Sequence, residues 1–298
     1  MDEAPREDNG YGGYDRAALD AQYDNRKRHP EHARLHAAWA ADGPKVLKAF
    51  DHRLDVAFGS APDETLDVYL PKKRKRTKPA PVNVFLHGGY WMNRHKNDFR
   101  FLARGLVPAG AILVVVNYAL VPRVTLAQQV DQCRAAVAWT WRHADDFGGD
   151  RERIFVSGHS AGGHLTAMML ATDWPSFAPG LHRTLVKGGA ALSGIYDLEP
   201  IRHCYLQATL RFTAEDAALL SPLRLAPKTD APALIAVGGA ETDEFLRHSD
   251  VLAAAWASRL ADCRLMIASG LNHFTVLGAL ADPASALNRA VRAQMGLA

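Results

Sequence analysis

Cysteine is scarce in this chain of 298 residues, which contains only Cys133, Cys204 and Cys263. Three widely separated cysteines have neither the spacing of a disulfide framework nor that of a metal site, and they favour a reducing compartment. Long apolar runs are missing too: Ala111 to Val116, for example, is far too short to span a bilayer. The first ten residues are acidic and polar, unlike a secretion signal. We therefore expect a cytoplasmic protein without a membrane partner.

An excess of charge of one sign is also lacking, because 35 Lys and Arg face 32 Asp and Glu, for a net charge of +3. This balance is too mild to indicate a nucleic-acid partner. The one basic run, Lys72 to Lys78, lies between Pro71 and Pro79. It has two interpretations, a localisation or polyanion-binding patch and a solvated loop between strands, and loop behaviour favours the second.

From about residue 50 onward, short apolar segments alternate with segments of helical spacing. Ala111–Tyr118 opens with a continuous apolar run and is typical of a strand buried on both faces, and Asp98–Leu106 has apolar residues at helical spacing. Such alternation predicts an α/β fold, with a mostly parallel central sheet and helices on both faces. The expected strands are Arg53–Phe58, Thr65–Leu70, Val82–Leu86, Ala111–Tyr118, Arg153–Val156, Leu185–Leu192, Ala233–Val237 and Arg264–Ala268.

Two segments lie outside this alternation. Residues 1–50 are polar with scattered aromatics and are expected to form an N-terminal helical arm. Residues 198–225 form the longest interval without a strand in the second half, and they are a candidate for a small cap over the site. Neither a repeat nor a Ser/Gly-rich linker divides the chain, so residues 1–298 are expected to form a single domain.

The strongest chemical signal is Gly158-His159-Ser160-Ala161-Gly162, which has the pattern G-x-S-x-G. It follows an apolar strand and opens an amphipathic helix, the setting of a nucleophile elbow in the α/β-hydrolase fold. A sharp strand-to-helix turn strains the backbone of the nucleophile, and only glycine leaves room on either side. Ser160 is therefore the predicted nucleophile.

A second motif, His87-Gly88-Gly89-Tyr90-Trp91, directly follows the expected strand that ends at Leu86. The glycine pair lets the backbone turn so that its amides face the pocket of the nucleophile. Together with the amide of Ala161, the amides of Gly88 and Gly89 are expected to form an oxyanion hole. Tyr90 and Trp91 either contact substrate or pack in the core, and His159 is a third candidate substrate-binding residue.

The general base should be a histidine after the last strands, because this fold orders its triad as nucleophile, acid, histidine. His273 meets that condition, and no histidine follows it. The acid should follow the strand Ala233–Val237, where Glu241 comes first and Asp243 is the alternative. Asp243 resembles a first-turn residue of the next helix, so Glu241 is favoured. A metal mechanism is not expected, since the chain has no H-E-x-x-H pair.

The motifs together resemble kynurenine formamidase (arylformamidase) and its esterase-like relatives. The segments that carry the resemblance follow in the order of that family: Leu19–Tyr23, His87–Trp91, Asn117–Leu120, Gly158–His164, Ser193–Leu198, Glu241–Phe245 and Asn272–Phe274. The resemblance implies hydrolysis of N-formylkynurenine to kynurenine and formate in tryptophan breakdown, without a cofactor. It assigns Ser160 as nucleophile, His273 as base and Glu241 as acid, where many relatives have aspartate.

Two other functions remain open from the sequence. Members of the same family also act as general esterases, so a short-chain carboxylesterase acting on a small ester is the first alternative. A catalytically inactive hydrolase that serves as a binding protein is the second, although such proteins usually lose a triad residue. A homodimer is suggested only by the general frequency of dimers among soluble proteins.

Overall fold

The computed structural model describes residues 10–72 and 78–297. Residues 73–77, the middle of the basic run, lie outside the described residues, so neither interpretation of that run is tested. None of the helices in the described ranges combines the length and the apolar character that a membrane-spanning helix needs.

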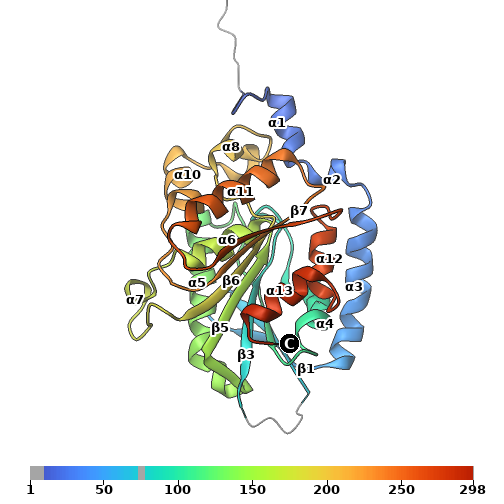
Figure 1. Cartoon of the computed structure of the whole chain (residues 1–298), viewed down its shortest axis with the longest axis vertical. Coiled ribbons are helices and arrows are strands. Elements are labelled where there is room, and N and C mark those ends of the chain that lie inside the picture. The colour runs from blue at the N-terminus through green and yellow to red at the C-terminus, as the bar shows by residue number, and fades with distance from the viewer. Residues whose placement is uncertain (1–9, 73–77, 298) are drawn as a thin grey trace, which may run out of the picture.

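The centre of the molecule is an eight-stranded sheet in the order β1-β2-β4-β3-β5-β6-β7-β8 (Figure 1). β2 pairs antiparallel with β1 and with β4, and all other neighbours are parallel. The predicted mostly parallel sheet is therefore confirmed. Its strands are β1 (Asp51–Ala57), β2 (Thr65–Leu70), β3 (Ala80–Leu86), β4 (Ile112–Val116), β5 (Gly149–His159), β6 (Val186–Leu192), β7 (Ala233–Gly238) and β8 (Cys263–Ala268).

Helices cover both faces of this sheet, as predicted (Figure 1). One core contains Val84 of β3 and residues of α5, α6 and α11, and the opposite core contains Phe85 and residues of α3, α12 and α13. Because both faces are covered, β3 and β4 are buried along their whole length. These helices are α3 (His32–Ala49), α4 (Ala103–Leu106), α5 (Leu126–His143), α6 (Ala161–Leu170), α11 (Asp243–Ala257), α12 (Thr275–Ala281) and α13 (Ala286–Gln294).

Shorter helices fill the connections. Near the N-terminus α1 (Arg16–Tyr23) and α2 (Asn25–Arg28) precede the long α3. Residues 198–225 contain three short α-helices and one 3₁₀ helix, η3. The remaining short helices are η2 (Ala144–Phe147), α7 (Trp174–Phe177), α8 (Glu199–Arg202), α9 (Gln207–Leu210), α10 (Ala214–Leu220) and η3 (Pro222–Arg224).

The helix expected over Asp98–Leu106 is shorter than predicted. The segment forms the 3₁₀ helix η1 (Lys96–Leu102) and only then the single α-helical turn α4. A 3₁₀ helix aligns residues three apart, which buries Phe99 and Leu102 together. Lys96 fixes the start of η1, because its fully buried ammonium pairs with Asp67 at 2.6 Å.

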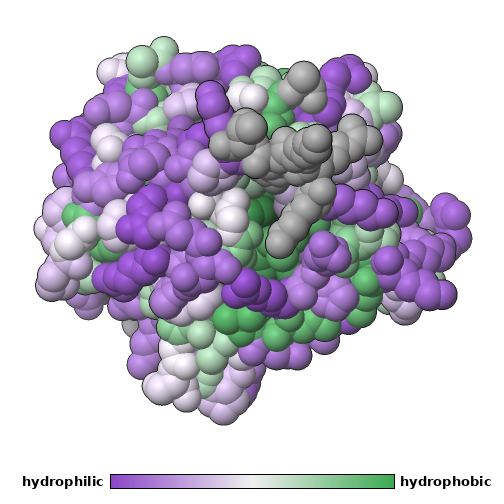
Figure 2. Space-filling model, turned by 90° about the horizontal axis from the view of Figure 1, so that it is seen from below, coloured by the Kyte–Doolittle hydropathy of each residue, from purple (hydrophilic) through white to green (hydrophobic). Residues whose placement is uncertain are grey.

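The two ends of the parallel strands differ in character. Figure 2 views the molecule from below, toward the end at which β3 begins, where apolar residues surround a hollow that Phe50, Val107 and Leu297 help to line. The predicted catalytic residues lie at the other end, because Gly88 and Ser160 follow directly after β3 and β5. In open α/β sheets, ligands bind outside these carboxyl ends of the strands.

Candidate active site

Ser160 occupies a strained turn between β5 and α6. Its φ of 58° and ψ of −123° lie in a region that non-glycine residues rarely adopt. A Cβ at Gly158 would lie 2.2 Å from the Gly162 carbonyl oxygen, and a Cβ at Gly162 would lie 1.9 Å from the Leu86 carbonyl oxygen. Both glycines of the G-x-S-x-G pattern are thus required by backbone contacts. The turn lifts the Ser160 side chain out of the sheet and into a pocket that it helps to line.

His273 contacts a buried carboxylate. Its Nδ1 lies 2.7 Å from Oε2 of Glu241, and both side chains are almost completely buried. The other carboxylate oxygen, Oε1, accepts hydrogen bonds from Ser193 Oγ at 2.5 Å and from the Gly238 amide at 2.7 Å. These contacts leave Glu241 one orientation, with Oε2 toward the imidazole. Asp243, the alternative acid, is exposed in the first turn of α11.

The arrangement suits a proton relay. Glu241 accepts from Nδ1–H of His273, which leaves Nε2 as the nitrogen that can take up a proton. His273 and Ser160 line the same pocket, although they are supplied by segments 113 residues apart. The structure therefore brings together the three side chains that the sequence predicted: a hydroxyl on a strained turn, an imidazole and the carboxylate that orients the imidazole.

The predicted oxyanion loop follows β3 and touches the serine turn. A Cβ at Gly88 would lie 2.6 Å from the His159 carbonyl oxygen, so only glycine permits this approach. Gly89 has a φ of 118° and faces the backbone of Asn93. Ala161 is the first residue of α6, where the amide has no partner within the helix.

Hydrogen bonds to the carbonyl oxygens fix the direction of the loop amides. Tyr118 Oη donates to the His87 carbonyl, and His87 Nδ1 lies 2.8 Å from the Gly88 carbonyl oxygen. In a planar trans peptide the N–H points opposite to the C=O. Anchoring these two carbonyls therefore orients the amides of Gly88 and Gly89. Burial lowers the pKa of His87 to about 4, so the ring stays neutral in this role.

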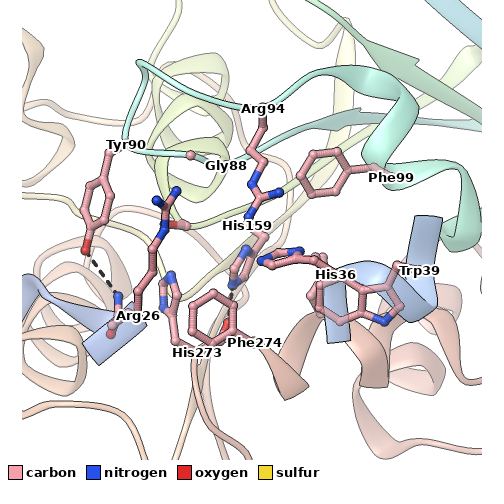
Figure 3. A pocket seen from close by; sticks show the side chains of 14 residues that line it. Arg26, His36, Trp39, Gly88, Tyr90, Arg94, Phe99, His159, His273 and Phe274 are labelled. Atoms are coloured by element: carbon pink, nitrogen blue, oxygen red, sulfur yellow. Dashed lines mark hydrogen bonds between the residues drawn. The ribbon is translucent and has the colours of Figure 1, made fainter. Parts of the chain in front are cut away.

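Of the three candidate substrate-binding residues, Tyr90 and His159 line the pocket (Figure 3). Trp91 lies in the core instead: it is fully buried, its Nε1 donates to His164 Nδ1 at 3.2 Å, and its ring packs edge-on against Phe212. A positive φ at both Tyr90 and Trp91 sends the neighbouring side chains in different directions. Trp91 thus takes the packing alternative, while substrate contact by Tyr90 stays a prediction for a residue that lines the pocket.

His159 supports the loop that carries His273. Its Nε2 donates to the His273 carbonyl oxygen at 2.7 Å, and the two rings lie 4.7 Å apart (Figure 3). Burial lowers the pKa of His159 well below its usual value, and the nearby His273 adds to this effect. A neutral ring is what the site needs, because a positive charge here would oppose protonation of His273.

Several pocket residues were not predicted from the sequence. The segment before β1 supplies Asn25, Arg26, His36 and Trp39, and the loop after Tyr90 supplies Arg94. The remaining lining is aromatic or apolar: Phe99, Phe274 and Leu277. The scattered aromatics of the N-terminal segment were the only signal in the sequence that could have indicated this role.

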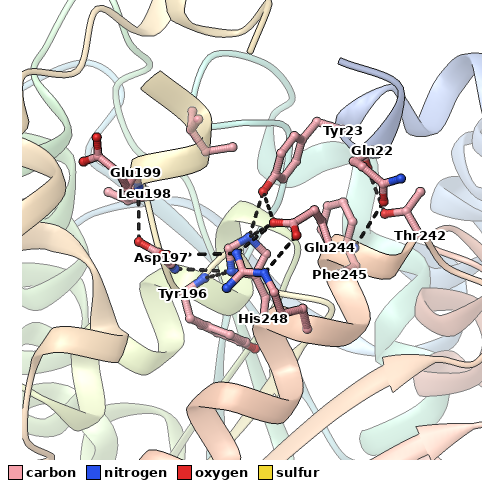
Figure 4. A network of polar contacts seen from close by, with 12 residues as sticks. Gln22, Tyr23, Tyr196, Asp197, Leu198, Glu199, Thr242, Glu244, Phe245 and His248 are labelled. Carbon is pink, nitrogen blue, oxygen red and sulfur yellow. Dashed lines mark hydrogen bonds and ion pairs between the residues drawn. The ribbon is translucent and has the colours of Figure 1, made fainter. Parts of the chain in front are cut away.

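A buried polar network holds the N-terminal segment in place (Figure 4). Tyr23 Oη donates to Glu244 Oε2 at 2.9 Å and lies 3.0 Å from His248 Nε2. Arg247 binds both oxygens of Glu244, at 2.8 and 2.7 Å. Because Glu244 is only three residues from Glu241, the segment that contains the predicted acid also anchors the helices beside the pocket.

Tyr90 extends this anchoring into the pocket. Its hydroxyl donates to the Tyr23 carbonyl and accepts from Asn25 Nδ2 at 3.2 Å (Figure 3). Within the described part of the chain, no group of three or more His, Cys, Asp or Glu side chains is placed to hold a metal ion.

Comparison with known proteins agrees with this architecture. A family model described as BD-FAE matches residues 66–177. Kynurenine formamidase from Danio rerio is 33% identical over 255 residues, which cover 84% of each chain. Esterase LipC from Mycobacterium tuberculosis is 34% identical over 158 residues, 51% of this chain and 39% of that protein.

A crystal structure also matches most of the chain. It is described as a candidate thioesterase from Silicibacter sp. TM1040, with 31% identity and a TM-score of 0.79 over 91% of this chain and 97% of that one. The resemblance found in the sequence is thereby confirmed. The chain belongs to the kynurenine formamidase family of α/β hydrolases.

Proposed function

We propose that this chain is a serine hydrolase that cleaves N-formylkynurenine to kynurenine and formate, with Ser160 as nucleophile, His273 as base and Glu241 as acid. The observation that carries the proposal is the 2.7 Å contact between His273 and Glu241, in the pocket that also contains the strained Ser160. Membership of the kynurenine formamidase family supports the substrate. The activity would belong to tryptophan breakdown in the cytoplasm.

The reaction would proceed by acyl transfer to the enzyme. His273 Nε2 takes the proton of Ser160 as its Oγ attacks the formyl carbon. When the tetrahedral intermediate collapses, the C–N bond breaks and His273 passes the proton to the leaving aniline nitrogen. Water then attacks the formyl-enzyme with His273 again as base, and formate leaves as Ser160 regains its proton.

Charge develops on the formyl oxygen during both attacks. The amides of Gly88, Gly89 and Ala161 would stabilise this oxyanion, at about 3 kcal/mol for each donor. The amides cost little reorganisation, because hydrogen bonds to the preceding carbonyls already orient the loop. Glu241 would stabilise the imidazolium that forms at the same time.

A short-chain carboxylesterase is the second candidate, favoured by the similarity to esterase LipC over half of this chain. The chemistry of the triad would be the same, since an ester oxygen replaces the amide nitrogen as leaving group. What differs is the leaving group that the pocket accepts. The aromatic lining by Tyr90, Phe99 and Phe274 favours an aryl group over an alkyl chain.

The test is a comparison of kcat/KM for N-formylkynurenine, formanilide and p-nitrophenyl esters of increasing acyl length. We expect turnover of the formyl aryl amides and a steep loss with acyl length, all abolished in Ser160→Ala. Ser176→Ala is the matched control, since Ser176 is exposed on α7 and its hydroxyl donates to Asp173. Turnover of esters alone would reject the formamidase proposal in favour of the carboxylesterase.

A further inference from the structure

Two arginine side chains reach into the candidate pocket from opposite sides (Figure 3). Arg26 comes from the short helix α2, and Arg94 comes from the loop that follows Tyr90. Arg94 has a φ of 83°, an unfavourable conformation for a residue with a Cβ. The backbone N–H of Arg94 donates a hydrogen bond to Oδ1 of Asn93 at 2.7 Å. A strained backbone that aims a charged side chain into a pocket indicates a functional role.

Neither guanidinium has an ion-pair or hydrogen-bond partner among residues 10–72 and 78–297, and no dashed line reaches either one in Figure 3. Two other cations with little exposure do have partners. Buried Lys96 pairs with Asp55 and Asp67, and half-buried Arg247 pairs with Glu244. Half-buried Arg94 lacks such a partner, and so does Arg26, which is exposed, so the donors of both remain available to a ligand.

The two charges also affect the groups around them. Burial lowers the pKa of Arg94, Asp98 raises it and the charge of Arg26 lowers it. Burial, and after it the charges of Arg94, His32 and Arg26, lower the pKa of His36 to about 4. His36 is thus neutral near pH 7, while the arginines remain charged. Their mutual repulsion in a partly desolvated site would be relieved by an anion between them.

The rest of the lining defines what the anion is attached to. His36, Trp39, Phe99 and Phe274 present rings, and the Phe274 ring lies 5.5 Å from that of His36. A planar aromatic group stacks favourably on such rings, while a planar carboxylate matches the fork of a guanidinium. The combination favours an aromatic carboxylate over a bare inorganic anion or an alkyl chain.

We propose that Arg26 and Arg94 bind the carboxylate of an aromatic substrate and so determine a preference for acyl compounds that carry a negative charge. This inference rests on the proposed function, because it concerns the same pocket. The new element is that two residues far from the triad in sequence bind the carboxylate end of the substrate. Arg26 and Arg94 act as specificity residues, whereas the triad performs the chemistry.

Binding can be measured without turnover, which separates this inference from the proposed function. Ser160→Ala protein is titrated calorimetrically with 4-oxo-4-phenylbutanoate, an aryl ketone that ends in a carboxylate, and with the neutral 4-oxo-4-phenylbutanamide. We expect the acid to bind on the order of 10- to 100-fold more tightly than the amide, as for other hydrogen bonds to charged groups. Adding Arg26→Gln or Arg94→Gln should remove most of that preference while leaving the affinity for the amide unchanged.

Arg28→Gln is the matched control, because Arg28 is exposed on the same helix and does not line this pocket. It removes the same charge and should keep the preference for the acid. Equal affinities for acid and amide in the Ser160→Ala protein would overturn the inference. An equal loss in Arg28→Gln would overturn it too, since the effect would then come from net charge. A retained affinity for the amide shows that each variant is folded.

Discussion

Replacing Glu241 by glutamine tests how the imidazole is oriented. In the native site Oε1 accepts from Ser193 and Gly238, and Oε2 accepts from His273. A glutamine can supply only one oxygen. If that oxygen keeps the two contacts at Oε1, its NH₂ faces Nδ1 and forces the proton onto Nε2. If the amide turns round, its NH₂ meets the Gly238 N–H. The first arrangement loses the preferred tautomer, and the second keeps that tautomer but sets two N–H donors against each other at Gly238.

The expected loss of catalytic activity is large for so small a change in structure. Trapping the wrong tautomer of a catalytic histidine lowers kcat by about 10⁴-fold in a comparable triad. This corresponds to about 5 kcal/mol of transition-state stabilisation. The assay is kcat/KM on the best substrate of the panel between pH 6 and 9, with circular dichroism to show that the variant is folded. Glu241→Asp keeps the charge and should retain far more activity.

Asp243→Asn is the matched control, because Asp243 is the exposed alternative acid in the first turn of α11. We expect its activity to stay within a few-fold of the wild type. A Glu241→Gln enzyme within about tenfold of wild type, or a large loss in Asp243→Asn, would refute the assignment of the acid.

Three further changes have expected effects of known sign. Ser160→Gly removes activity but relieves the strain at φ 58°, so it should melt about 2 °C above Ser160→Ala, which keeps the strain. Tyr23→Phe removes the hydrogen bond to the Glu244 carboxylate, which should lower stability by about 1.5–3 kcal/mol and raise KM by loosening α2. Burial lowers the pKa of His248 to about 3, so the folded state takes up this proton only at a lower pH than the unfolded chain does. The stability that depends on this neutral ring is present above the unfolded pKa of about 6.5 and is lost as the pH falls below it. His248→Gln should therefore reduce the slope of the free energy of unfolding against pH, on the acid side, by about 1.4 kcal/mol per pH unit.

Each of these predictions has a result that contradicts it. Equal melting temperatures for the two Ser160 variants would mean that the turn stores no strain. An unchanged KM in Tyr23→Phe would separate the network in Figure 4 from the pocket. If the free energy of unfolding of His248→Gln falls with acid pH as steeply as that of the wild type, this histidine is not kept neutral by the fold.

The sheet was predictable because its signal is local. A continuous apolar run such as the one that includes β4 has few alternatives to a buried strand. The ends were harder to predict: β5 begins at Gly149, four residues before the predicted Arg153, because Gly149 already pairs with Ala80 of β3 ahead of an irregularity in the register. The serine turn was also predictable, since steric crowding alone requires Gly158 and Gly162.

The remainder of the pocket was not predictable, because it depends on contacts between distant segments. Helix α2 has four residues and shows no periodicity, yet it places Arg26 beside a loop nearly seventy residues away. Trp91 is adjacent to Tyr90 but points into the core, which is decided by backbone angles that its sequence neighbourhood does not reveal. Sequence motifs therefore indicated the chemistry, whereas the recognition surface required the tertiary structure.

Labelling with a fluorophosphonate, followed by mass spectrometry of the digested protein, tests the proposed nucleophile most directly. The account predicts one adduct per chain, located on Ser160, with labelling lost in Ser160→Ala and strongly slowed in His273→Ala. Absence of an adduct, or an adduct on another residue while Ser160 stays unmodified, would contradict it.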